Sequence, residues 1–412
     1  MKLLPLSVMP DLLQAVARSL VRLARRRELL AFLRKLRHSA AAIRLNLFLA
    51  MPELRGTRRL TATAWRTVAY RVWNDLDFEL MRWRRHSVQG LERLRECLAE
   101  GRGVIACSQH LGAYRRVYYE LVRQGFDVTL VADDRVASTL KAATRAQLLR
   151  QHAPAAEIAR LESGLTVLDA TEPGMVRRIF EALDRNSIVL IYIDGNTGAR
   201  WHGGEGAPNT TVVEVFGQQL AVRHGACQIA HAKRVSIVPI VAWWQAGLRP
   251  AMTCLPPIAP SPAVPVGEFC QRTLQRLFTL AAGEIHKDPP QFEHWMYLHR
   301  WWSGPRPAAA VTSEAVEAAR LELIAAGNDV LYRIDRRRIL VLRMGERRVL
   351  VDAVRGSLVE AGRLLADLVR LLGHRRSYRG LRTRLRPRYP GAELLAALAQ
   401  LKAWGMLVEA PD

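Results

Sequence analysis

Four short apolar runs in the middle of the chain constrain its fold more than any other feature. They cover residues 103–108, 127–132, 187–193 and 236–243, and helical or glycine-rich stretches separate them. Continuous apolar runs that alternate with helices are typical of parallel strands in a sheet that is covered on both faces. The sequence therefore predicts an α/β fold with a mostly parallel sheet flanked by helices.

The chain before these runs has helical periodicity. Residues 11–37 predict one or two helices, with Leu12 and Val16 on one face and Arg18 elsewhere. A basic amphipathic helix of this kind can lie in the headgroup region of an anionic membrane. An ordinary helix packed on the protein body would show the same pattern. We expect a helical N-terminal region, with basic amphipathic helices in residues 1–38, and both uses remain open.

The end of the chain has a different texture from the middle. Residues 303–311 are rich in Pro, Gly and Ala and predict a linker between a domain of residues 39–302 and one of residues 312–412. The last domain should be small and α+β. Its predicted elements are a helix, a hairpin turning at Gly345, three helices and a final strand, at residues 313–326, 338–344, 347–353, 358–372, 377–386, 391–404 and 406–409.

The net charge of +23 implies an acidic partner. Nucleic acid, an anionic membrane face and an acidic carrier protein all fit. Arginine supplies most of the excess, because only six of the 61 basic residues are lysines. A genome-wide composition bias would explain part of that excess, so the charge by itself does not choose among the partners.

Cysteine and histidine spacing predicts neither disulfides nor a metal centre. No pair of cysteines has CxxC spacing, and His202, His224 and His231 lack metal-ligand spacing with carboxylates. No apolar stretch of about 18 residues occurs, and the N-terminus lacks the compact apolar segment of a signal peptide. We expect a cytoplasmic protein that does not span a bilayer. The five cysteines are Cys97, Cys107, Cys227, Cys254 and Cys270.

Two polar residues follow predicted strands in positions suited to chemistry. His110 comes directly after residues 103–108 and before a helix, and Asp194 directly follows residues 187–193. Ligands of parallel sheets bind beyond the carboxyl ends of the strands, so both side chains should lie near one crevice. A histidine there can act as a general base, and Gly112 would let a substrate approach the backbone.

Five segments in the same order resemble the late lipid A biosynthesis acyltransferases, of the lysophospholipid-acyltransferase-like superfamily. The resemblance covers roughly residues 40–302, and each segment alone is a weak signal. The segments are residues 44–53 with an Asn and a Pro-Glu pair, His110 with Gly112, residues 194–200 (Asp-Gly-Asn-Thr-Gly-Ala-Arg), Phe216 with Gly217, and residues 289–302 with their Pro, Gln, Trp and Arg-Trp pattern.

This resemblance implies an acyltransferase-type fold and an acyl-transfer reaction. His110 would remove a proton from a hydroxyl or amine of a glycolipid or other membrane-associated acceptor. The acceptor would then attack the thioester of a fatty acyl group on acyl carrier protein or coenzyme A. No cofactor is implied beyond this acyl-thioester co-substrate. The protein would be peripheral on the inner face of the cytoplasmic membrane, with an anionic membrane surface as partner.

One expected residue is missing from the resemblance. The family has an acid five residues after the histidine, whereas this chain has Arg115. A guanidinium has only donors, so it cannot accept the imidazole N–H, and its charge disfavours an imidazolium. Asp194 is the best replacement, ahead of Asp133 and Asp134, since Glu120 lies about 15 Å further along a helix. Arg115 could instead bind a phosphate, either in an altered site or in a relative without turnover that binds acyl carrier, lipid or peptide.

Further residues are candidates for substrate binding. Arg135 and Arg200 suit phosphate groups of the acceptor or of the carrier arm, although surface arginines in an arginine-rich chain need no such role. Gly198 belongs to a glycine-rich stretch that could close over substrate, and the resemblance adds Phe216 and Gly217. Phosphate-loop and dinucleotide motifs are absent, so nucleotide use is not predicted.

The last hundred residues resemble, more loosely, the winged-helix peptide-recognition domain of pyrroloquinoline quinone biosynthesis D-type proteins. The hairpin with residues 349–356, three helices and residues 404–409 carry the likeness. It implies a peptide or protein partner bound by strand addition to the hairpin. A basic winged helix could instead contact nucleic acid through Arg386 and Arg388, or the domain could be a docking appendage. We expect acyl carrier and membrane as partners rather than nucleic acid.

Overall fold

The computed structural model describes residues 26–80, 86–195, 209–300, 311–344, 347–354 and 357–410. It contains two compact units. The sheet unit comprises Met1–Leu33, Arg66–Tyr297 and Trp301–Ser303, and the C-terminal unit comprises Arg34–Trp65, Leu298–Arg300 and Gly304–Asp412. The domain boundaries expected at residues 38, 302 and 311 stay a prediction.

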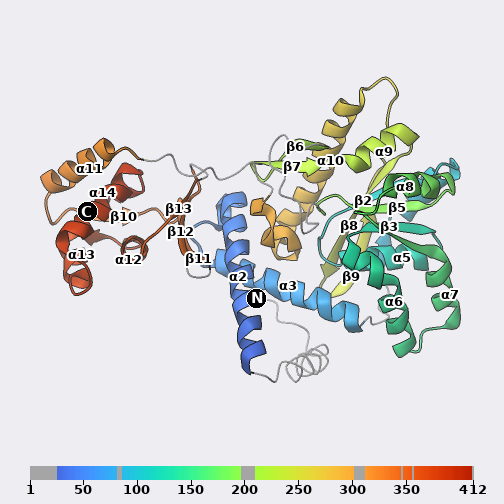
Figure 1. The fold of residues 1–412 in the computed structure, drawn as a ribbon, viewed down its shortest axis with the longest axis horizontal. Helices are drawn as coiled ribbons and strands as arrows, with labels where there is room; N and C mark the ends of the chain where they lie inside the picture. Colours follow the sequence, from blue (N-terminus) through green and yellow to red (C-terminus); the bar gives the residue numbers. More distant parts are fainter. Residues whose placement is uncertain are drawn as a thin grey trace. The chain divides into compact units, whose positions relative to one another are not determined.

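The sheet unit is built on a seven-stranded sheet of order β1-β9-β8-β2-β5-β3-β4 (Figure 1). All neighbouring pairs are parallel except β8 with β9. The α/β prediction with a mostly parallel sheet is therefore confirmed, and the four apolar runs are strands. The strands are β1 Ser87–Gln89, β2 Val104–Ser108, β3 Val128–Ala132, β4 Leu165–Asp169, β5 Ile188–Tyr192, β8 Ile237–Gln245 and β9 Arg249–Cys254.

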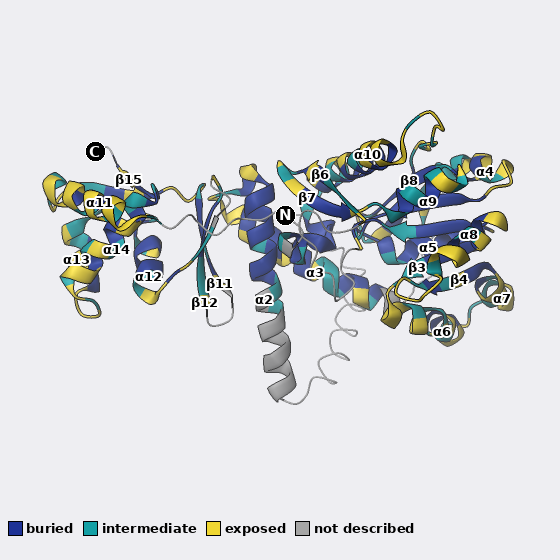
Figure 2. Cartoon of the chain, turned by 45° about the horizontal axis from the view of Figure 1, so that its top comes forward, coloured by how far each residue is buried: buried dark blue, intermediate teal, exposed yellow. Residues whose placement is uncertain are grey.

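Helices cover both faces of this sheet, which explains why its central strands are apolar throughout. On one face Val104 and Ala106 pack in a core with residues of α4, α5, α6 and α7. On the other face α8 contacts β5 and α9 contacts β2. Buried positions accordingly run through the central strands in Figure 2. The helices are α4 Leu91–Ala99, α5 Val117–Arg123, α6 Asp134–Arg150, α7 Ala155–Gly164, α8 Met175–Asp184, α9 Gly225–Lys233 and α10 Val266–Lys287.

Shorter elements complete the sheet unit. The hairpin of β6 (Thr210–Val215) and β7 (Gln218–Arg223) is separate from the main sheet. The 3₁₀ turn η3 (Tyr114–Arg116) follows the carboxyl end of β2. Residues 289–300, called the closing segment below, contain the 3₁₀ turns η4 (Pro289–Gln291) and η5 (Glu293–Met296).

Two long helices, α2 (Arg26–Ala50) and α3 (Arg58–Leu80), confirm the helical N-terminal region over the residues that the structure describes. The described residues leave out most of residues 1–38, where basic helices are expected, and nearly all of the linker predicted at residues 303–311. No helix in the described ranges is both long and apolar enough to cross a membrane.

The C-terminal unit contains two three-stranded antiparallel sheets, of order β14-β10-β15 and β11-β12-β13. The predicted hairpin is confirmed as β11 and β12, although Gly345 lies outside the described residues. The helix expected from residue 358 begins later, because β13 pairs with β12 before the chain turns at Gly362. The elements are α11 Ser313–Ala326, β10 Leu331–Ile334, β11 Ile339–Met344, β12 Arg347–Asp352, β13 Ser357–Glu360, α12 Arg363–Leu371, β14 Arg376–Ser377, α13 Tyr378–Leu385, α14 Gly391–Ala403 and β15 Leu407–Glu409.

Candidate active site

The register of two neighbouring strands brings His110 and Asp194 together. Strands β2 and β5 are parallel, and their last residues, Ser108 and Tyr192, are paired. His110 and Asp194 each lie two residues beyond these ends, so they emerge at the same edge of the sheet. Two apolar strands that pair in parallel thus place an imidazole beside a carboxylate.

Asp194 holds His110 through both of its oxygens. Its Oδ1 lies 2.8 Å from His110 Nδ1, and its Oδ2 accepts the backbone N–H of His110 at 2.8 Å. The Asp194 side chain is buried, whereas that of His110 is 21% exposed. A carboxylate bonded to Nδ1 fixes the tautomer in which Nε2 is the basic atom. A buried carboxylate is therefore bonded to His110, and it comes from the residues after β5 instead of from η3, which carries Arg115.

The charge state of Asp194 follows from its partners. Burial by itself would raise the pKa of Asp194, but His294 and His110 lower it, the latter also through its hydrogen bonds. The carboxylate is therefore ionised near neutral pH and can stabilise an imidazolium.

Aromatic rings surround the His110 imidazole. Tyr114 and Tyr192 lie 4.6 Å and 5.0 Å from it between ring centroids, and the Tyr192 hydroxyl donates to the backbone oxygen of Tyr114 at 2.7 Å. His294 stacks on it at 4.2 Å with an interplanar angle of 19°. Burial raises the pKa of both tyrosines and lowers the pKa of His294 to about 3. All three rings are therefore neutral near pH 7.

The sequence did not single out His294, which comes from the closing segment and is buried. Its Nδ1 lies 3.1 Å from Asp194 Oδ2. The ligand atoms of His110, Asp194 and His294 fall within 4.8 Å of one another, a donor set that transition metals accept. The contact of 2.8 Å between His110 Nδ1 and Asp194 Oδ1 is a hydrogen bond, the arrangement of a carboxylate-oriented base in proton transfer.

Arg115 belongs to an ionic network beside the site. Its Nη1 lies 2.6 Å from Asp75 Oδ1, and its Nε donates to the Tyr114 hydroxyl at 2.9 Å. Glu293 accepts from that hydroxyl at 3.0 Å and lies 2.7 Å from Arg71. Two carboxylates thus face the two guanidinium groups, and the Tyr114 ring contacts both His110 and Arg115.

Two other candidates from the sequence, Gly112 and Asp133, have structural roles in the fold. At Gly112, with φ +55°, an added Cβ would lie 2.3 Å from Trp243 Cα, so close packing on β8 explains this glycine without a substrate. Asp133 caps α6, accepting the N–H of Val136 at 2.9 Å. Arg135 is exposed in the first turn of α6.

Glu120 is engaged away from His110, as its place in the sequence suggested. It lies 2.8 Å from His86 Nδ1 and accepts from Arg123 and Gln124. Burial would raise its pKa, but these hydrogen bonds lower it to about 2. Two further candidates, Gly198 and Arg200, lie outside the described residues.

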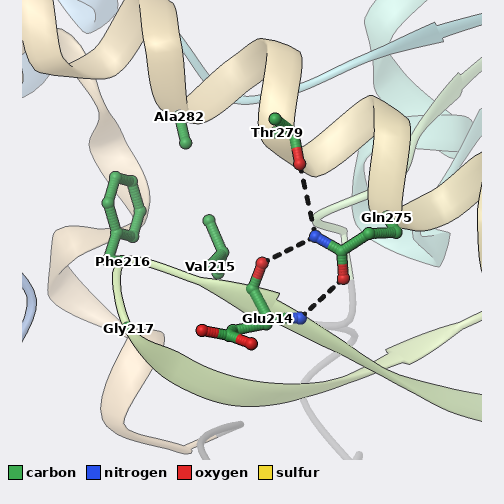
Figure 3. Close-up of a pocket in the computed structure, with 7 residues that line it drawn as sticks. All are labelled: Glu214, Val215, Phe216, Gly217, Gln275, Thr279 and Ala282. Carbon is green, nitrogen blue, oxygen red and sulfur yellow. Dashed lines mark hydrogen bonds between the residues drawn. The ribbon is translucent and has the colours of Figure 1, made fainter.

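Phe216 and Gly217 form the turn of the β6–β7 hairpin. Their φ angles of +54° and +67° are those of a two-residue hairpin turn that favours glycine. Both line a cleft of about 320 Å³ between the hairpin and α10 (Figure 3). Gln275 of α10 closes one side, bonding the backbone N–H and carbonyl of Glu214, each at 2.8 Å. Neither His110 nor Asp194 lines this cleft, although the Phe216 ring lies 5.1 Å from the ring of Trp295, the residue after His294.

Comparison with known protein families finds a match. The family described as bacterial lipid A biosynthesis acyltransferase matches residues 2–303, which include His110, Asp194 and His294. No curated protein is significantly similar to the chain. The match ends before α11, so the likeness of the last hundred residues to a winged-helix peptide-recognition domain has no support from it.

Proposed function

Because the chain belongs to the bacterial lipid A biosynthesis acyltransferase family, we propose that it transfers a fatty acyl group to a hydroxyl or amine of a membrane glycolipid with His110 as general base. Membership makes the chain an acyltransferase and implies a lipid A precursor as acceptor and an acyl donor as second substrate. The proposal adds the base, its partner Asp194 and the order of events.

The 2.8 Å contact between Asp194 Oδ1 and His110 Nδ1 carries this proposal. His110 Nε2 takes the proton of the acceptor hydroxyl, whose oxygen attacks the thioester carbonyl carbon. The tetrahedral intermediate collapses, the C–S bond breaks, and the imidazolium returns its proton to the leaving thiolate. Asp194 keeps the ring oriented and stabilises the imidazolium between these two transfers.

Arg115 favours the second candidate, a family member that binds acyl carrier, lipid or peptide without turnover. Two observations weigh against it. Asp75 and Glu293 face the Arg115 guanidinium, and Asp194 supplies the acid that the sequence lacks five residues after His110. We therefore favour an active enzyme.

The same proposal covers the acyl donor, the other contacts with substrate and the location of the protein. Acyl carrier protein or coenzyme A would carry the acyl group, and Arg115, Arg135 and Arg200 are candidates for phosphate contacts. Phe216 and Gly217 would contact substrate at the α10 cleft. The lipid acceptor and the charge of +23 support a peripheral position on the anionic inner face of the cytoplasmic membrane.

Radiolabelled acyl transfer tests the mechanism. The full chain would be incubated with lipid extract and either acyl carrier protein or coenzyme A thioesters. We expect His110→Ala to lower transfer about 10²- to 10⁴-fold. His231→Ala is the matched control, because His231 bonds the Val264 carbonyl at 2.9 Å and faces Phe269 instead of the site. Transfer that survives His110→Ala would reject His110 as the base.

A further inference from the structure

A backbone pairing holds His294 over the proposed base. The N–H of Glu293 donates to the carbonyl of His110, and the N–H of Gly112 donates to the carbonyl of Gln291, both at 3.0 Å. The closing segment therefore runs antiparallel to the loop that carries His110. Both hydrogen bonds lie within the three residues before His294, so they tie the backbone that leads into His294 to the loop that carries His110.

A side-chain anchor ties the same segment to the sheet. The Gln291 amide accepts the Trp244 N–H at 2.7 Å and donates to the Trp244 carbonyl at 3.0 Å, in a buried position. It also donates to Asp288 at 2.9 Å. Strand β8 therefore positions the closing segment, which in turn positions the imidazole.

The His294 ring closes one face of the His110–Asp194 pair. It is 2% exposed, stacks on His110 at 4.2 Å and 19°, and has its Nδ1 3.1 Å from Asp194 Oδ2. A flat ring at this distance limits tilting of the His110 ring about its bond to Asp194. The ring also keeps water away from the Asp194 carboxylate, whose electrostatic interaction with His110 is stronger when water is excluded.

From this geometry we propose that His294 is a positioning residue, whose stacked ring holds His110 in the plane required for proton abstraction. The inference rests on His110 being the base of the proposed transfer. By analogy with the residues that orient metal ligands, whose loss costs about 10- to 100-fold in activity, we expect an effect of that size from His294. The effect should fall on kcat, because His294 is buried and cannot contact the acceptor directly.

Three substitutions test whether the flat ring of His294 or its polar nitrogen positions His110. His294→Asn keeps a polar atom near Asp194 and loses the ring, His294→Leu loses both, and His294→Phe keeps a flat ring. We expect kcat to fall about 10- to 100-fold in the Asn and Leu variants, with KM within about threefold, and to recover at least partly in the Phe variant. His231→Leu, the matched control, should keep wild-type kcat.

Thermal unfolding and an NMR signal complement the kinetic measurements. Thermal unfolding should show each variant folded at the assay temperature. The N–H proton between His110 and Asp194 should give a downfield NMR resonance that His110→Gln abolishes and that His294→Asn broadens or shifts. Wild-type kcat in His294→Asn, or a Phe variant as slow as the Asn variant, would overturn the inference. If the native chain transfers no acyl group, the proposed function fails, while the resonance still tests the positioning.

Discussion

Each unit of the molecule buries one aspartate near the end of a strand, and the partners of the two aspartates differ. Asp194 follows β5 and accepts from the His110 backbone N–H at 2.8 Å, while Asp352 ends β12 and accepts from the Val354 N–H at 2.9 Å. The second oxygen of Asp194 meets an imidazole. Asp352 meets the guanidinium of Arg338, at 3.0 Å to Nε and 2.7 Å to Nη2.

The difference lies in what the partner can do with a proton. A guanidinium stays protonated at any physiological pH, so Asp352 and Arg338 form a permanent ion pair that can only hold structure. Arg338 also donates to the Gly405 carbonyl at 2.6 Å, tying the hairpin to the end of α14. An imidazole can take up a proton and give it back during a reaction, so the same kind of carboxylate beside His110 can serve chemistry.

Asp194→Asn should give the largest effect and mainly on activity. The amide keeps the shape of the carboxylate but loses the charge that stabilises the imidazolium. By analogy with other carboxylate–histidine pairs, we expect kcat to fall about 10³- to 10⁴-fold. Steady-state acyl transfer together with thermal unfolding measures it. A loss below tenfold would mean that Asp194 does not act on His110.

Asp352→Ala should give the next largest effect, and on stability alone. It leaves the Arg338 guanidinium without its counter-charge, which costs about 3 kcal/mol for a pair with one partly exposed member. The double variant Asp352→Leu with Arg338→Met should recover most of this loss, because neither charge then remains. Urea unfolding gives the free energies, and kcat of the folded protein should stay within about twofold. If kcat fell as it does in Asp194→Asn, the contrast between the two aspartates would be wrong.

Acid should weaken the sheet unit through His294. Its pKa in the folded protein is about 3, below the value of about 6.5 in an unfolded chain, so the unfolded state binds the proton more readily. The stabilisation is complete above pH 6.5 and is lost as the pH falls from 6.5 towards 3. Between pH 7 and pH 5 we expect a loss of about 2 kcal/mol in the free energy of unfolding.

His294→Phe should remove this pH dependence, while the other groups that face the ring, namely His110, Asp194 and Arg71, remain in place. Urea unfolding at both pH values compares the variant with wild type and with His231→Phe. An identical pH slope in wild type and His294→Phe would show that His294 is not the group that titrates.

Arg115→Glu should have the smallest effect of the four. It restores an acid at the position where the family has one, but beside Asp75 and Glu293, which lie 2.6 Å and 3.8 Å from the present guanidinium. We expect a loss of about 1–2 kcal/mol from broken charged hydrogen bonds and like-charge repulsion, and no gain in acyl transfer. Arg115→Gln separates loss of the cation from added repulsion. A gain in transfer with Arg115→Glu would favour the impaired-site alternative.

Local patterns were enough to predict much of the fold. The runs at residues 103–108 and 187–193 are apolar because their strands have no solvent-facing side, and this can be recognised without coordinates. The edge strand β4 escaped prediction because only some of its residues are buried, which weakens the apolar signal. β13 was mistaken for the start of a helix, because its four residues become a strand only by pairing with β12.

The sequence alone determined that His110 and Asp194 follow the two strands, and parallel-sheet geometry then placed them at one edge. Only the tertiary structure decided that His110 and Asp194, which are 84 residues apart in the sequence, are in contact at 2.8 Å. It also decided that His294 stacks on the His110 imidazole and that two carboxylates face Arg115. The reason is physical: periodicity along a chain records which side of an element is buried. Contacts between side chains far apart in sequence depend on strand register and on how the closing segment folds back.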